Sequence, residues 1–217
     1  MYTICDLYDL EHTQAKSYLE GFTYPWEALE GIKDTILALG QTLGEEYREV
    51  SPQVWVHTTA KIAPTAYIGA PCIIGPETEV RHCAFIRGSA LIGAGCVVGN
   101  STELKNVILF DSVQVPHYNY VGDSILGYKS HMGAGSITSN VKSDKSLVVI
   151  HGEEKIPTGI KKVGAMLGDF VEVGCNSVLN PGTVIGRNSS VYPTSCVRGV
   201  IPEGSIYKKD DTIIKKR

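Results

Sequence analysis

Three side chains in the middle of the chain have types and spacing that could support chemistry. His117 is a candidate general base, because histidine is the only side chain whose ordinary pKa allows proton uptake near neutral pH. Arg87 and Lys105 are two cations 18 residues apart. Cations held side by side repel each other unless an anion lies between them, so this pair is a candidate phosphate site.

Each candidate also has a structural alternative. A carboxylate of Glu79, of Glu103 or of a partner subunit could neutralise the two cations. His117 could be a structural residue, since a lone histidine is not by itself a site. Which alternative holds depends on the elements that position these side chains.

A period of six residues governs most of the chain. Aliphatic residues, closed by one phenylalanine, stand at Val56, Ile62, Ile68, Ile74, Val80, Ile86, Ile92, Val98, Leu104 and Phe110, and again at Leu167, Val173, Leu179, Ile185, Val191 and Val197. A small residue follows most of them four positions later, as at Ala60, Cys72, Cys96, Thr102, Ser177 and Ser195. One aliphatic and one small inward position per hexad predict a mainly β protein, a single-stranded parallel β-helix. Three hexads make a triangular coil of 18 residues, so Arg87 and Lys105 should lie on one face, one strand spacing of about 4.8 Å apart.

The repeat is interrupted twice. Between Phe110 and Leu126 its phase slips by two residues, and we expect Val115 and Tyr120 to point inward there. His117 falls in this slip, where a side chain can be aimed toward a ligand. Residues 139–162 lack the period and are predicted to form an inserted loop, which in solenoids often lies on the binding face.

The two ends of the chain differ from the repeat. Residues 1–50 are predicted to be a helical segment, in which a helix starts near Pro25, carries an apolar stripe and ends at Gly40. This segment should pack on the β-helix or cap its open end. The β-helix domain should span residues 51–207, and residues 208–217 should form a basic, solvated tail.

Composition narrows the class of protein. The 217 residues are 43% hydrophobic, without a run of about 18 apolar residues or a leader-like start, so we expect no membrane segment and a cytoplasmic location. The six cysteines show no metal-ligand spacing, which favours a reducing compartment. Residues 1–50 hold 10 acidic and 3 basic side chains. The rest of the chain holds 13 acidic and 17 basic side chains and is therefore mildly basic. That balance suits a small anionic ligand and is too weak to indicate nucleic acid.

Three segments resemble a known family. Residues 98–105 (VGNSTELK), 117–123 (HYNYVGD) and 133–140 (GAGSITSN) resemble the acetyltransferase domain of the bifunctional glucosamine-1-phosphate acetyltransferase/N-acetylglucosamine-1-phosphate uridylyltransferase, and related sugar-1-phosphate nucleotidylyltransferases. The resemblance covers residues 54–207 and implies a left-handed β-helix. The nucleotidylyltransferase domain has no counterpart, because residues 1–50 are too short for it and contain no Gly-rich phosphate loop.

The resemblance implies a role for each matching position. His117 would be the general base, and Arg87 and Lys105 would hold the sugar phosphate. The other substrate-binding positions would be Tyr120, Asn140, His131, which stands where the family has asparagine, and Lys145, the nearest lysine to the family's loop lysine. Acetyl-CoA would meet the backbone of Ala134, the side chain of Cys175, and Lys208 or Lys209. Such sites form between the subunits of a homotrimer in this family.

The leading hypothesis is therefore an acetyl-CoA-dependent N-acetyltransferase that acts on glucosamine 1-phosphate or galactosamine 1-phosphate, in nucleotide-sugar or cell-envelope precursor synthesis. It would need no metal and would have no nucleotidylyltransferase activity of its own. The alternative is a noncatalytic hexapeptide-repeat protein that binds a nucleotide sugar or a partner enzyme. A zinc-dependent carbonic anhydrase is disfavoured, because no second histidine closely follows His117.

Overall fold

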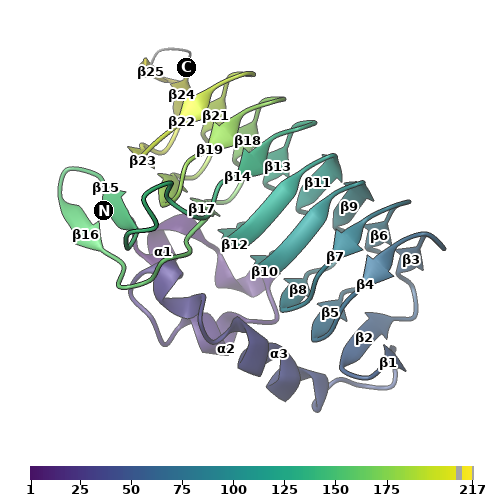
Figure 1. Cartoon of the computed structure of the whole chain (residues 1–217). Helices are drawn as coiled ribbons and strands as arrows, with labels where there is room; N and C mark the ends of the chain where they lie inside the picture. The colour runs from purple at the N-terminus through teal and green to yellow at the C-terminus, as the bar shows by residue number, and fades with distance from the viewer. Residues whose placement is uncertain (209–211, 217) are drawn as a thin grey trace.

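The computed structural model describes residues 1–208 and 212–216, which form a three-sided parallel β-helix flanked by short helices (Figure 1). Face 1 contains β2 (Val54–His57), β5 (Cys72–Ile74), β8 (Ala90–Ile92), the ends of β10 (Glu103–Leu109) and β12 (Tyr120–Leu126), β17 (Ala165–Leu167), β20 (Thr183–Ile185) and β23 (Val200–Ile201). Face 2 contains β3 (Lys61–Ile62), β6 (Glu79–Val80), β9 (Val97–Asn100), β11 (Gln114–His117), β13 (His131–Met132), β18 (Glu172–Val173), β21 (Ser190–Val191) and β24 (Ser205–Tyr207). Face 3 contains β4 (Tyr67–Ile68), β7 (Phe85–Ile86), the starts of β10 and β12, β14 (Ile137–Thr138), β19 (Val178–Leu179) and β22 (Cys196–Val197). The predicted fold class is confirmed.

The hexad positions form the core. The aliphatic positions from Ile74 onward are buried, whereas Ile62 and Ile68 in the first coil are only partly covered. The small positions lie at tight corners, where a hydroxyl satisfies a carbonyl of the next coil: Thr78 Oγ1 donates to Gly93 O at 2.7 Å. Burying each aliphatic side chain contributes about 1.5–3 kcal/mol, so the repeat itself supplies most of the driving force for folding.

The phase slip shortens two successive coils by one residue each. Strand register pairs Ile86 with Leu104, 18 residues later, but it pairs Leu104 with Val121 and Tyr120 with Ile137, each 17 residues later. Val115 is fully buried, as predicted. The prediction for Tyr120 is wrong: Val121 occupies the inward position, and Tyr120 lies half-buried on the outer side of face 3. The reason is the first shortened coil, which brings Val121 into register with the buried Leu104.

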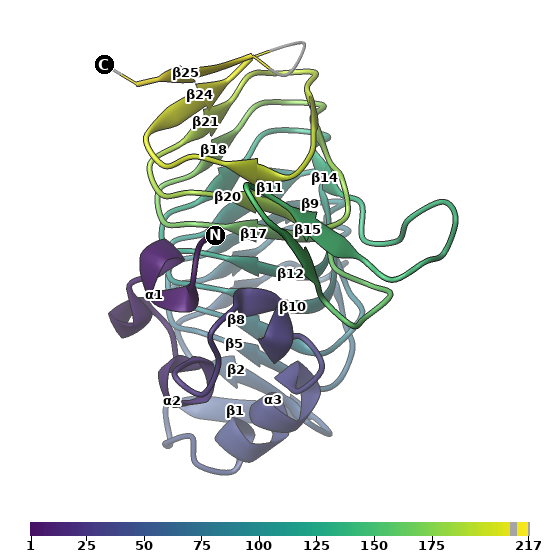
Figure 2. The same ribbon diagram turned by 90° about the vertical axis from the view of Figure 1, so that its left-hand side faces the viewer.

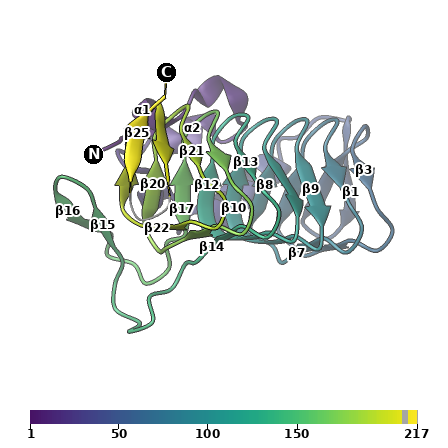
Figure 3. The same cartoon turned by 90° about the horizontal axis from the view of Figure 1, so that it is seen from above.

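The insertion at residues 139–162 is present as predicted. It contains a hairpin of β15 (Val149–His151) and β16 (Lys155–Pro157), which stands off from the coils in Figure 3. Val148 and Ile150 anchor it, because both are buried and approach Gly182. The β-helix resumes at β17, where Met166 pairs with Ile125.

The N-terminal segment lies along face 1 (Figure 2). It comprises α1 (Ile4–Leu7), η1 (Leu10–His12), α2 (Lys16–Leu19), η2 (Pro25–Ala28) and α3 (Ile32–Gly40), none of which is long enough to cross a membrane. The expected helix from Pro25 to Gly40 is thus divided into a 3₁₀ turn and an α-helix, because the chain turns at Gly31 against the Tyr18 hydroxyl.

Polar contacts attach this segment to the β-helix. Tyr8 donates its hydroxyl to Ile125 O at 3.3 Å, and Asn106 Nδ2 donates to Leu29 O at 3.1 Å. The helices of this segment therefore pack on the side of the β-helix and do not cap its open end. The edge of the first coil is instead covered by β1 (Tyr47–Ser51), which pairs antiparallel with β2.

The C-terminal tail is more ordered than the sequence indicates. Residues 213–215 are exposed to solvent, but they form β25 (Ile213–Lys215), which pairs antiparallel with β24 and closes the last coil. The isoleucines of β25 favour a strand, but the interpretation of this segment from its basic residues did not take them into account. Lys209 lies outside the described residues.

The thiols of the two buried cysteines should be unreactive in the folded protein. All six are free thiols; Cys72 and Cys96 are buried, and the other four are exposed. Burial raises the pKa of the Cys96 thiol to about 12 and that of Cys72 still further. We expect an aromatic disulfide reagent to label four thiols in native protein and six in denaturant. Rapid labelling of all six without denaturant would contradict this core, and Cys175→Ser should remove one native equivalent.

Candidate functional site

Arg87 and Lys105 lie on neighbouring coils of face 3, as their spacing predicts. The Arg87 N–H donates to Leu104 O at 2.9 Å, and Arg87 therefore sits directly beside Lys105 in the stack. Both cations have partners within the chain: Arg87 Nη1 lies 2.8 Å from Glu103 Oε1, and Lys105 Nζ lies 3.2 Å from Asp123 Oδ2. Glu103 was one of the expected neutralising carboxylates, whereas Asp123 was not among them.

Asp123 is the centre of this arrangement. Its side chain is almost fully buried and accepts hydrogen bonds from Lys105 Nζ, from Asn106 Nδ2 at 3.0 Å and from Asn140 Nδ2 at 2.5 Å. Asn140 Nδ2 also donates to the Tyr120 hydroxyl at 3.2 Å. Burial, with the nearby Asp123 charge, raises the pKa of Tyr120, so the phenol stays protonated.

Six side chains thus form one polar group, called here the face 3 cluster: Arg87, Glu103, Lys105, Tyr120, Asp123 and Asn140. A glycine leaves room for it, since a Cβ at Gly122 would lie 2.5 Å from the Tyr120 hydroxyl. The four positions predicted to bind sugar or phosphate on this face do come together. Sequence reasoning missed Asp123, because in the 17-residue coil the strand partner of Lys105 is Gly122 and Asp123 lies one residue beyond it.

His117 ends β11, at the corner between faces 2 and 3. Its ring is exposed and forms no hydrogen bond with any described residue, so both ring nitrogens are accessible. The backbone is fixed instead: the His117 N–H donates to Asn119 Oδ1 at 3.1 Å. Asn119 is buried and donates to Gly133 O at 2.9 Å and to Ser136 O at 3.1 Å, which ties the corner to the next coil.

Two further predicted positions follow His117 along the same corner. The Gly135 N–H donates to His117 O at 3.0 Å, and the Asn176 N–H donates to Ala134 O at 2.8 Å. Ala134 and Cys175 therefore lie on the two coils after His117. Lys208 lies further along, with Nζ 5.7 Å from the Tyr192 ring. The expected acetyl-CoA residues thus lie toward the C-terminal end of one corner.

Two predicted substrate residues lie apart from the face 3 cluster. His131 Nδ1 is 2.8 Å from Glu172 Oε2 on face 2. Lys145 lies in the outer part of the insertion, where its backbone N–H donates to Lys142 O. Within one chain neither residue contacts the cluster.

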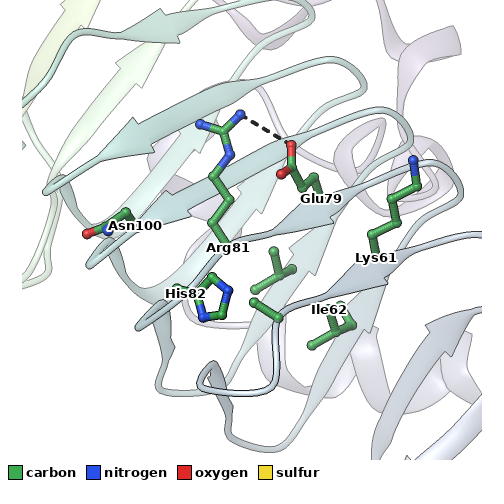
Figure 4. Close-up of a pocket in the computed structure, with 8 residues that line it drawn as sticks. Lys61, Ile62, Glu79, Arg81, His82 and Asn100 are labelled. Atoms are coloured by element: carbon green, nitrogen blue, oxygen red, sulfur yellow. Dashed lines mark hydrogen bonds and ion pairs between the residues drawn. The ribbon is translucent and has the colours of Figure 1, made fainter.

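A cavity of about 480 Å³ lies on the other side of His117, over the first coils of face 2 (Figure 4). Arg81 and Glu79 form an ion pair there at 3.2 Å, and Asn100 is the strand neighbour of His117. His82, in the same cavity, contacts the Thr65 hydroxyl at 2.9 Å. The described residues hold no group of three or more His, Cys, Asp or Glu side chains placed to bind a metal.

A β-helix of hexads with an exposed histidine on one corner is the architecture of a hexapeptide-repeat protein. The chain belongs to the family of the GMPPB C-terminal domain, whose model matches residues 71–201. It is 35% identical over 114 residues to the bifunctional protein GlmU of Methanococcus maripaludis. These residues cover 52% of this chain and 28% of that protein. It is also 31% identical over 105 residues, 48% of this chain and 26% of the other, to the bifunctional sugar-1-phosphate nucleotidylyltransferase/acetyltransferase of Sulfurisphaera tokodaii.

Similar solved structures include a hexapeptide transferase family protein from Anaplasma phagocytophilum, with a TM-score of 0.42 and 15% identity over 75% of this chain and 78% of that one. Another is the acetyltransferase domain of PglB from Neisseria gonorrhoeae in complex with acetyl coenzyme A, with a TM-score of 0.34 and 16% identity. The match covers 70% of this chain and 53% of that one. The chain matches about a quarter of the length of the two bifunctional relatives.

Proposed function

We propose that the protein is an acetyl-CoA-dependent N-acetyltransferase whose acceptor is an amino-sugar 1-phosphate. The observation that carries the proposal is the position of His117. Its ring forms no hydrogen bond with any described residue and lies on the corner that Ala134 and Cys175 continue on the next two coils. Tyr120 of the face 3 cluster follows three residues later in the sequence. The name of the Sulfurisphaera tokodaii relative, a bifunctional sugar-1-phosphate nucleotidylyltransferase/acetyltransferase, supports the same reaction class.

The chemistry would be direct acetyl transfer. The acceptor amine attacks the thioester carbonyl carbon while His117 takes a proton from the amine. A C–N bond forms, the C–S bond breaks, and the proton passes from His117 to the departing CoA sulfur. A backbone N–H at Ala134 would stabilise the oxyanion of the tetrahedral intermediate, and positioning of the two substrates would supply much of the remaining acceleration.

The site would be completed by a homotrimer. His131 and Lys145 lie away from the face 3 cluster of their own chain, so they would serve the cluster of a partner subunit. Cys175 and Lys208 would contact acetyl-CoA, and the cation of Lys208 suits its phosphates. Acetyl transfer needs no metal in this mechanism. The product would enter nucleotide-sugar or cell-envelope precursor synthesis.

A second candidate function is noncatalytic binding of a nucleotide sugar or a partner enzyme. One observation favours it: Glu103 and Asp123 already neutralise Arg87 and Lys105, so the expected phosphate site is occupied by side chains of the same chain. An anion must displace these carboxylates or share the cations with them.

Release of free thiol from acetyl-CoA tests the two functions. We expect release with glucosamine 1-phosphate or galactosamine 1-phosphate, and at least about tenfold lower kcat/KM with unphosphorylated glucosamine, since each charge-assisted hydrogen bond to the phosphate contributes about 1.5–3 kcal/mol. The phosphorylated sugar with the higher kcat/KM identifies the acceptor. Folded protein that releases no thiol with any amine would contradict acetyl transfer and leave the binding function.

A further inference from the structure

A second, smaller cavity adjoins the face 3 cluster. It has a volume of about 220 Å³ and lies between three parts of the chain. It is lined by Leu29 and Glu30 of the N-terminal segment, Asn106 and Asp123 of the β-helix, and Lys161 and Lys162 at the end of the insertion. Asp123 belongs to both the cavity and the cluster, so the two are continuous.

The end of the insertion is held firmly against the cluster. The Val163 N–H donates to Asn140 O at 3.0 Å, and the Gly164 N–H donates to Asp123 O at 2.8 Å. Lys162 forms an isolated bridge with Val141, the residue after Asn140. These bonds fix the backbone that carries the two lysines beside the two side chains at the centre of the cluster.

The charges distinguish these lysines from the cations of the cluster. Lys161 and Lys162 are exposed, and neither forms an ion pair with any residue in the described part of the chain. Arg87 and Lys105 are already paired with carboxylates. An incoming anion therefore gains more from the two unpaired lysines, because it displaces no bound carboxylate there.

We propose that this cavity is the phosphate subsite of the acceptor, with Lys161 and Lys162 as its phosphate-binding residues. The proposal rests on the proposed function and specifies how that site recognises its substrate. Its volume lies below the roughly 300–1,000 Å³ of cavities that take drug-sized ligands, so it accommodates a phosphate monoester rather than a nucleotide. Glu30, which also lines the cavity, disfavours additional negative charge.

The insertion provides its own control. Lys142 and Lys155 have the same side chain and lie in the same inserted segment, but Lys142 contacts Asp144 and Ser146, and neither lysine lines the cavity. Lys142→Gln/Lys155→Gln therefore changes the charge of the insertion by the same amount as Lys161→Gln/Lys162→Gln. Only the second pair alters the subsite.

Titration calorimetry of the full chain with glucosamine 1-phosphate, and separately with inorganic phosphate, tests the subsite. We expect the Lys161→Gln/Lys162→Gln variant to bind both at least about tenfold more weakly, the control pair to bind within about twofold of the wild type, and Glu30→Gln to bind about twofold to threefold more tightly. Equal weakening by both lysine pairs, no weakening by the first pair, or no binding of either ligand to the wild type would overturn the proposal.

Kinetics separate this subsite from the proposed function. If the wild type releases thiol, the Lys161→Gln/Lys162→Gln variant should raise KM for the sugar phosphate at least about tenfold with kcat nearly unchanged, because ground-state and transition-state binding are lost equally. If the wild type binds glucosamine 1-phosphate through these lysines but releases no thiol, acetyl transfer fails and the subsite stands. Thermal melting should match the wild type in all three variants, since Glu30, Lys155, Lys161 and Lys162 are exposed and Lys142 is partly exposed.

Discussion

His117→Ala should lower kcat for acetyl transfer about 10²–10⁴-fold, the range that a general base contributes. The folded state should not change, because the imidazole ring is exposed and unbonded among the described residues. The bond that orders this position, from the His117 N–H to Asn119 Oδ1, belongs to the backbone and survives the substitution. KM for the sugar phosphate should change little, since the proposed phosphate-binding residues, Lys161 and Lys162, lie in the insertion.

The measurement combines initial rates of thiol release with thermal melting of each variant. His151→Ala is a matched control, because His151 is also an exposed strand residue but lies on the hairpin of the insertion. It should keep wild-type kcat. A His117→Ala variant that retains wild-type kcat would show that another group takes the proton, and a large fall in melting temperature would show that His117 is structural.

The β-helix was predictable because its core is periodic in sequence. Each hexad places one aliphatic residue inward, so burial of the positions from Ile74 to Leu104 follows from spacing alone. The failure at Tyr120 has the same origin. The chain passes from Leu104 to Val107 in one residue fewer than from Ile86 to Ala90, and the resulting 17-residue coil places Val121 in the core and Tyr120 outside.

The candidate site was predictable to the extent that it follows the stack. The 18-residue spacing predicted that Arg87 and Lys105 are neighbours and that Glu103 is available as a partner. The roles of Asn106, Lys161 and Lys162 were not predictable, because they depend on how the N-terminal segment and the insertion pack on the β-helix. Such contacts join residues with no shared period.

Gly99→Ala should be among the most damaging single changes in the chain. A Cβ at this position would lie 1.5 Å from Pro116 O, far inside van der Waals contact, and the clash is with backbone that cannot rotate away. Strand β11 would have to move away from β9, and this would displace His117, the residue that follows Pro116. We expect a loss of about 3 kcal/mol in the free energy of unfolding, at the upper end of the cost of overpacking, and loss of most thiol release.

Denaturant unfolding followed by circular dichroism measures the first effect, and initial rates measure the second. Gly152→Ala is the control, because its Cβ would come no closer than 3.2 Å to Met1 Cε and Val200 Cγ2, side-chain atoms that can shift slightly. Neither glycine has a positive φ, so alanine costs little backbone strain at either position and the comparison isolates the steric clash. If Gly99→Ala unfolds at the wild-type denaturant concentration, then β9 and β11 do not approach as closely as this register requires, and the corner that presents His117 is built differently.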